Sequence, residues 1–235
     1  MEIPVYLAMT AAEFRTYNPL PLHPAWLSCL FSPYGQGLSN VPKQLPPNSL
    51  LILSDRTSPR GHDTELIFQT LARVIPELHC SGLLLDFERA ENEENLEIAK
   101  ALTSLPCPVA VSATYAHKLD CPVFLPAPPP SEPLNHHIAP WEGREIWLEI
   151  SALGQTVTIT ETGAVSNACS TPPLLPFRDN TLSCHYAVDI KENEVTFTLH
   201  RTMDDLKALL STHTSSGVTR AVGLFQEFQS DHNLT

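Results

Sequence analysis

Short apolar runs alternate with amphipathic segments through the first 130 residues, and this alternation limits the folds open to the chain. Six runs predict buried strands, at residues 4–9, 26–31, 49–53, 82–87, 109–113 and 123–125. Their apolar residues are continuous rather than alternating with polar ones, which is typical of parallel strands covered on both faces. The pattern therefore favours an α/β fold with a parallel sheet.

Two of the intervening segments have the periodicity of amphipathic helices. Residues 62–78 place an apolar stripe on one face, behind Asp63, a residue type that begins helices well. Residues 92–105 carry a second stripe and gather acidic residues in the first turn, where the helix dipole stabilises negative charge. The middle of the chain is thus predicted to alternate strand and helix.

The second half of the chain is less regular. Four segments are expected to be extended, at residues 145–150, 155–160, 182–190 and 194–200, the last two joined by a polar turn. A helix over residues 203–212 and a final strand over residues 220–228 follow. About eight strands of parallel type result, so we expect a compact TIM-type (β/α)8 barrel with some helices shortened or replaced by loops, forming a single domain over residues 1–235.

Charge and hydropathy exclude two classes of partner. Lys and Arg number 14 against 26 Asp and Glu, and the formal net charge of −12 repels nucleic acid and anionic lipid. No apolar run approaches the ~18 to 20 residues that span a bilayer. The first six residues lack the features of a secretory signal, so we expect a cytoplasmic protein.

No metal or other cofactor is expected. The six cysteines are scattered without zinc-ligand spacing, the adjacent His136 and His137 cannot readily share one ion, and no glycine-rich phosphate loop follows a predicted strand. The cysteines are therefore expected to be reduced thiols. If an export signal had been removed, pairing into disulfides would be the alternative.

Two acids at the end of the fourth apolar run give the strongest functional signal. Asp86 and Glu88 are separated by one residue, and side chains at positions i and i+2 of a strand share a face, about 6.5 to 7 Å apart. Both carboxyl groups should point into the mouth of the barrel, where catalytic groups lie. One of two neighbouring carboxyl groups can be held protonated by the other. The alternative is that the two acids form an exposed strand end or cap the following helix. Glu91, Glu93 and Glu94 already supply negative charge at the start of that helix, however.

Residues 81–88 resemble the fourth-strand motif of glycoside hydrolase family 18, D-G-x-D-x-D-x-E, and keep its glycine and its last two acids. The chain resembles the chitinase-like barrels of that family over nearly its whole length, in particular the spore-cortex and peptidoglycan type. Residues 194–197, 203–207 and 217–225 are similar to the family's closing strand, helix and eighth strand.

The resemblance implies hydrolysis of N-acetylated amino-sugar glycans such as peptidoglycan or chitin. Glu88 would protonate the glycosidic oxygen, while the substrate's own N-acetyl group attacks the anomeric carbon. Asp86 would orient that acetamido group. The implied partner is a carbohydrate.

Several positions depart from the family pattern. The first two acids of the motif are replaced by Ser81 and Leu84, and the sixth run lacks the Tyr-Asp pair that active members usually carry. These losses favour the alternative that the barrel is catalytically degenerate and binds a glycan or a protein partner. An amidohydrolase or an aldolase is a third reading, but the sequence lacks the His cluster or the strand-end Lys that they need.

Candidate substrate-binding residues follow from the same comparison. Tyr115 would reach the space of the missing pair, or alternatively be a half-buried packing residue. Phe225 stands at the position of the family's pocket-floor tryptophan, followed by Gln226 and Glu227. Independently of the resemblance, Tyr34 lies in the loop after the second run, where an aromatic ring can stack on a sugar; an ordinary turn is the alternative. Asp55 and Arg56, after the third run, are expected to form surface pairs or a helix cap, with a contribution to the mouth of the barrel as the alternative. The oligomeric state is left open.

Overall fold

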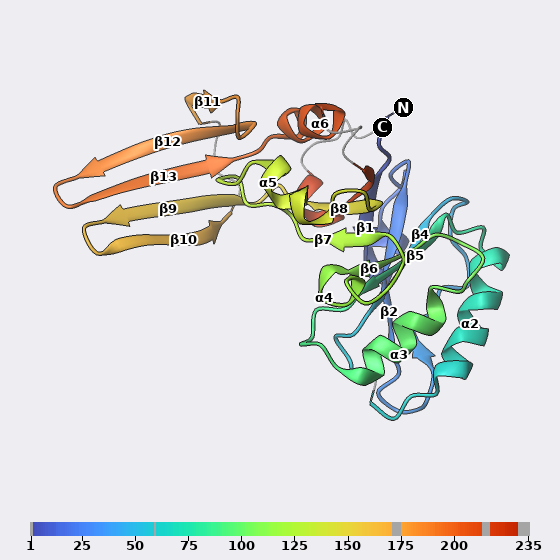
Figure 1. Ribbon diagram of the computed structural model, residues 1–235. Coiled ribbons are helices and arrows are strands. Elements are labelled where there is room, and N and C mark those ends of the chain that lie inside the picture. The colour runs from blue at the N-terminus through green and yellow to red at the C-terminus, as the bar shows by residue number, and fades with distance from the viewer. Residues whose placement is uncertain (1, 59, 171–174, 213–216, 230–235) are drawn as a thin grey trace.

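The computed structural model describes residues 2–58, 60–170, 175–212 and 217–229. Eight strands pair in parallel and close into a barrel (Figure 1), because the last of them returns to pair with the first. Around the barrel they are β1 (Val5–Met9), β2 (Pro24–Phe31), β4 (Leu50–Ser54), β5 (Gly82–Asp86), β6 (Val109–Ser112), β7 (Val123–Leu125), β8 (Ile146–Ile150) and β14 (Val218–Leu224). The TIM-type barrel is confirmed.

The two long helices lie where their periodicity predicts them. They are α2 (Thr64–Glu77) and α3 (Glu93–Leu102), and the side chain of Asp63 caps α2 by accepting a hydrogen bond from the Leu66 N–H at 3.1 Å. The other helices are α1 (Ala11–Thr16), α4 (Ala113–Ala116), α5 (Leu134–Ile138), α6 (Met203–Thr212) and two short 3-10 helices, Ala139–Trp141 and Phe225–Phe228. Between β2 and β4 the described chain forms the short strand β3 (Leu38–Ser39) and loops in place of a helix.

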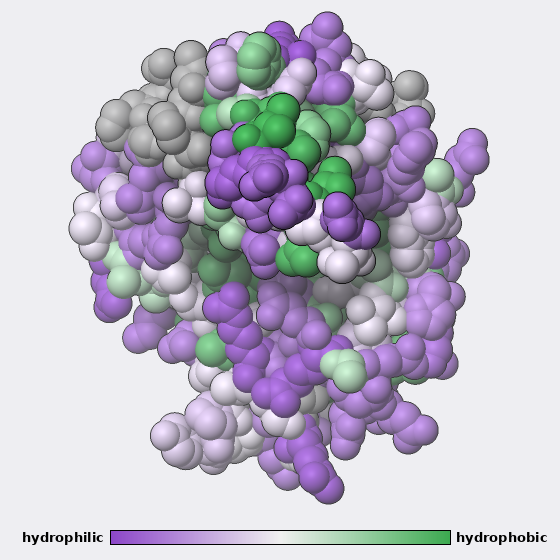
Figure 2. Space-filling view, turned by 90° about the vertical axis from the view of Figure 1, so that its left-hand side faces the viewer, coloured by the Kyte–Doolittle hydropathy of each residue, from purple (hydrophilic) through white to green (hydrophobic). Residues whose placement is uncertain are grey.

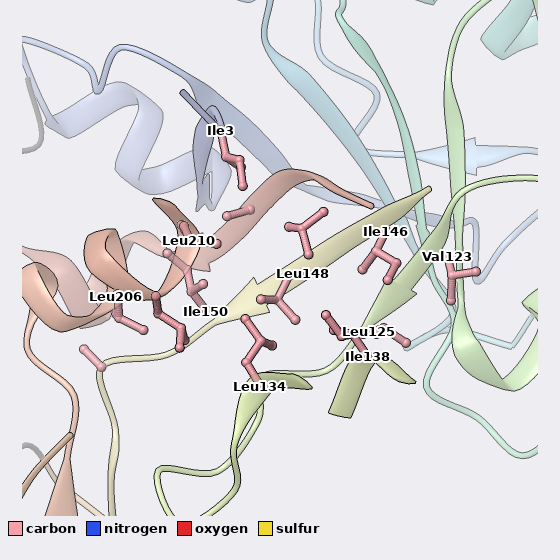
Figure 3. Close-up of a cluster of buried hydrophobic side chains, with 14 of the residues drawn as sticks. Ile3, Val123, Leu125, Leu134, Ile138, Ile146, Leu148, Ile150, Leu206 and Leu210 are labelled. Atoms are coloured by element: carbon pink, nitrogen blue, oxygen red, sulfur yellow. The ribbon is translucent and has the colours of Figure 1, made fainter. Parts of the chain in front are cut away.

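Alternation along each strand separates two apolar layers. Leu83 and Leu85 of β5 face the layer beneath α2 and α3, whereas Leu84 faces the barrel interior with Phe124 and Trp147. A third cluster lies under α5 and α6, where the leucine and isoleucine side chains of β7, β8 and both helices converge (Figure 3). No helix in the described part of the chain is long and apolar enough to cross a membrane.

A second sheet, which the sequence did not predict, is inserted between β8 and α6. Its five antiparallel strands are β9 (Gly154–Thr160), β10 (Gly163–Cys169), β11 (Phe177–Asp179), β12 (Cys184–Lys191) and β13 (Glu194–His200). It projects to one side of the barrel (Figure 1). The single domain over residues 1–235 stays a prediction, because the inserted sheet neither proves nor excludes it.

The inserted sheet has one apolar and one polar face. Its strand register aligns Val157 with Phe197 and Val188 on one face, and Thr158 with Thr196 on the other. The apolar face is incompletely covered, with Ile190 75% exposed. Figure 2 views the molecule from the side to which this sheet projects, and hydrophobic residues lie there among hydrophilic ones.

Two details of the predicted order are wrong. Residues 194–197 were assigned by resemblance to a closing strand of the barrel, but they belong to β13 of the inserted sheet, and the barrel strand that precedes α6 is β8. The final strand ends at Leu224 rather than Phe228, because the chain turns into a 3-10 helix there. The residue pattern within a strand does not show which of the two sheets that strand joins.

Candidate active site

The carboxyl groups of Asp86 and Glu88 line one cavity at the carboxyl end of the barrel. The cavity has a volume of about 400 Å³. Asp86 is the last residue of β5 and points inward like Leu84, two residues earlier, while Glu88 lies in the loop that leads to α3. The two acids thus reach the same hollow from one strand and its continuation.

Asp55 holds the main chain that carries Glu88. This carboxylate is fully buried and accepts hydrogen bonds from the Glu88 N–H (2.9 Å), the Arg89 N–H (3.1 Å) and the Asn95 side-chain amide (2.8 Å). The prediction of a surface pair or a helix cap is wrong for Asp55, because the loop after β5 folds over it. Arg56, the next residue, is exposed and lines the cavity.

The surroundings of Asp86 favour the protonated form of its carboxyl group. Burial, followed by the charges of Glu88 and Glu149, raises its pKa to about 7, although the Arg56 guanidinium lowers it. Near neutral pH, Asp86 therefore exists in both protonation states and can store a proton beside Glu88.

Glu149 is a third carboxyl group in the cavity, and the sequence reasoning missed it. It lies near the end of β8, and its Oε2 accepts a hydrogen bond from the Ala127 N–H at 3.1 Å. Burial raises its pKa, the Ala127 N–H lowers it, and the charges of Glu227 and Glu88 raise it. A signal was present, since Glu149 is the one charged residue in the strand Ile-Trp-Leu-Glu-Ile.

Tyr115 does not reach the cavity. Its side chain is fully buried beneath α3, with its ring edge against Phe87. Its hydroxyl accepts hydrogen bonds from the side-chain amides of Asn92 (3.1 Å) and Asn95 (3.0 Å). The prediction that Tyr115 occupies the mouth is wrong because the chain turns into α4 directly after β6, which directs this side chain to the outer layer.

The predicted aromatic platforms are also misplaced. Tyr34 is 97% exposed in the loop after β2 and does not line the cavity. Phe225 packs edge-on against Tyr17, with ring centroids 4.7 Å apart, because β14 has already ended. Leu224 and, from the sixth barrel strand, Phe124 line the cavity instead.

The two polar residues after Phe225 lie outside the cavity as well. Gln226 is exposed and is not among the lining residues. Glu227 accepts hydrogen bonds from the Ser151 hydroxyl (2.7 Å) and the Ala152 N–H (2.8 Å). Glu227 therefore fixes the chain that follows β8, and its charge acts on the cavity through Glu149.

The cavity has an apolar floor and an acidic rim. Apolar side chains of the barrel interior, among them Leu84 and Phe124, form its base, and the three carboxyl groups and Arg56 surround it. Among the described residues, no group of three or more His, Cys, Asp or Glu side chains is placed to hold a metal ion. This arrangement can bind one apolar sugar face and supply acid and base groups beside it.

Comparisons with known proteins give the fold. No family profile and no curated protein sequence matches the chain. A GH18 chitinase mutant from Cycas revoluta, solved with (GlcNAc)4, aligns over 98% of this chain and 97% of its own with a TM-score of 0.60 and 11% identity. A class V chitinase mutant from Nicotiana tobaccum, solved with NAG4, aligns over 100% and 97% with a TM-score of 0.60 and 9% identity.

A bacterial enzyme has the same architecture. The spore cortex-lytic enzyme SleL of Bacillus cereus aligns over 97% of this chain and 73% of its own, with a TM-score of 0.55 and 9% identity. The chain therefore has the barrel fold of GH18 chitinases and of a spore cortex-lytic enzyme.

Proposed function

We propose that the protein is a glycoside hydrolase acting on glycans of N-acetylated amino sugars, of the peptidoglycan or chitin type. The observation that carries the proposal is that Asp86 and Glu88 line one cavity at the carboxyl end of a TIM-type barrel. Glu88 donates a proton to the glycosidic oxygen. Asp86, with a pKa of about 7, stores a proton next to it.

The main chain at Glu88 is fixed for this task. Asp55 binds the N–H groups of residues 88 and 89, so the loop does not have to be ordered when substrate binds. The Glu88 side chain is exposed on the cavity rim, where a glycosidic oxygen can approach it. The apolar floor, with Phe124, supports binding of the face of a sugar ring.

A second candidate is a catalytically degenerate barrel that binds a glycan without cleaving it. The observation in its favour is Leu84, which lines the cavity at the position where the resembled motif has an acid. Asp86 then has no acidic neighbour on the same strand to share its proton.

The test follows reducing ends and binding heat together, with N-acetylglucosamine oligomers and with peptidoglycan fragments. The wild type should release reducing ends, and Glu88→Gln should lower the rate by about 10²- to 10⁴-fold. Glu94→Gln, at an exposed position in the first turn of α3, is the matched control and should keep the wild-type rate.

Three outcomes separate the candidates. Binding heat without release of reducing ends would establish the degenerate barrel. An unchanged rate for Glu88→Gln would remove Glu88 from the mechanism. A wild type that neither binds nor cleaves either glycan would reject both functions.

A further inference from the structure

Two cysteines border a second cavity, at the amino end of the barrel and away from the candidate active site. Cys80 precedes β5 and Cys107 precedes β6, each by two residues, and both line this cavity of about 280 Å³. Both side chains also pack against the apolar layer beneath α2 and α3. The two thiol groups therefore lie on the same side of neighbouring strands.

The strand register places the α-carbons of this pair at a distance that a disulfide can bridge. Leu83 of β5 lies opposite Val109 of β6, and the Leu83 N–H donates to the Pro108 carbonyl oxygen at 3.0 Å. Continued towards the amino ends of the strands, this register sets Cys107 one position away from the residue opposite Cys80. A strand spacing of ~4.8 Å and a rise of ~3.3 Å per residue then separate the two α-carbons by about 5.8 Å. Disulfides usually join α-carbons that are ~4.4 to 6.8 Å apart.

The same register disfavours the other neighbouring cysteine. Val111 of β6 lies opposite Val123 of β7, so Cys121 is two positions out of register with Cys107. Their α-carbons are then about 8.2 Å apart, beyond the ~7 Å that a disulfide spans without movement of the backbone. The three remaining cysteines lie in strands that pair with neither β5 nor β6, namely Cys29, Cys169 and Cys184.

Electrostatic effects agree with this geometry. Burial, followed by the charge of Cys107, raises the pKa of the Cys80 thiol to about 11. Burial raises the pKa of Cys107 as well, although the Arg220 guanidinium lowers it. Among the described residues, the buried Nη1 of Arg220 has no hydrogen-bond partner. The guanidinium therefore stabilises a thiolate at Cys107, which is the form that exchanges with disulfides.

We propose that Cys80 and Cys107 are a modification site, which forms a disulfide when a low-molecular-weight disulfide acts as the oxidant. The Cys107 thiolate attacks one sulfur of the oxidant, whose S–S bond breaks and releases a first small thiol. The Cys80 thiolate then attacks the Cys107 sulfur and releases the second small thiol. The two protein sulfur atoms together lose two electrons, which the oxidant gains, and the protons of the two protein thiols pass to the released thiols.

The new bond would close the segment over residues 80–107, which contains Asp86, Glu88 and α3. A disulfide restricts the unfolded chain and so favours the folded state. Oxidation should therefore raise the thermal unfolding midpoint by about 5 to 10 °C, and dithiothreitol should reverse the rise. This inference does not depend on the proposed hydrolase function.

The test uses cystamine, a small disulfide, on the folded protein. After the reaction is stopped with acid, the protein is unfolded and its free thiols are alkylated with N-ethylmaleimide. The wild type should lose two of its six alkylatable thiols, and digestion should yield a linked peptide that contains residues 80 and 107.

Two variants separate this pair from general oxidation. Cys80→Ser should keep half of the oxidant as a mixed disulfide at Cys107 and show no rise in its unfolding midpoint. Cys121→Ser, whose residue precedes the next strand, is the matched control and should form the same linked peptide with the same rise.

The wild-type protein decides the question even if Cys80→Ser does not fold. Six alkylatable thiols after oxidation, or a linked peptide that joins any other pair, would overturn the modification site. An equal rise in midpoint for Cys80→Ser would also overturn it, because the rise would then come from another effect of cystamine.

Discussion

Replacing Asp86 with Asn should stabilise the protein above neutral pH. Burial and the neighbouring charges of Glu88 and Glu149 raise the pKa of this carboxyl group from 3.8 to about 7, so its charged form is disfavoured in the folded state. Between these two values the folded state binds more protons than the unfolded state. Stability therefore falls as the pH rises through this range, and the loss is complete above pH ~7.

The magnitude follows from the size of the shift. Each pKa unit corresponds to about 1.4 kcal/mol, so the move from 3.8 to about 7 corresponds to about 4 kcal/mol. Asn has nearly the same shape and carries no charge at any pH. The difference in unfolding free energy between Asp86→Asn and the wild type should thus increase by up to about 4 kcal/mol from pH ~4 to pH ~8.

Urea unfolding at pH 4, 6 and 8 measures this difference. Asp120→Asn, at an exposed position, is the matched control and should show no comparable increase. A difference that stays constant across the three pH values would refute the reasoning, because it would mean that the Asp86 carboxylate carries no burial penalty.

Two further substitutions test the parts of the site that the structure reassigns. Asp55→Ala leaves the Glu88 N–H, the Arg89 N–H and the Asn95 amide without their acceptor. The free energy of unfolding, measured in urea, should fall by about 3 to 5 kcal/mol. A fall of less than ~1 kcal/mol would contradict the buried network. Tyr115→Phe removes the hydroxyl bound by two asparagine amides and should cost about 1 to 2 kcal/mol. Its kcat/KM should stay at the wild-type value, and a raised KM with unchanged stability would instead support sugar contact.

Elements defined by local pattern could be read from the sequence. The strand at Gly82–Asp86 and the helix at Thr64–Glu77 agree with their predicted ranges because continuous apolar runs and 3.6-residue periodicity reflect burial directly. The inserted sheet was not predicted as a sheet. Its segments were recognised as extended, but pairing partners are chosen by contacts between distant residues, which a strand period does not contain.

In the candidate site, too, the local sequence predicts some features and distant contacts set the others. Asp86 and Glu88 share a cavity because two-residue spacing along one strand and its continuation is a local property. Glu149 joins them only through closure of the barrel, since β8 lies three strands away from β5 around the wall. Phe225 leaves the mouth because β14 ends one residue before it.

The sequence by itself determined that buried strands alternate with helices in the first half of the chain and that two acids leave the fourth strand together, because both follow from spacing between near neighbours. Only the tertiary structure decided that the pKa of Asp86 is raised to about 7, that Tyr115 is a packing residue, and that Glu149 borders the same cavity. Burial and electrostatic coupling arise between strands that are distant along the chain, and they exist only once the barrel has closed.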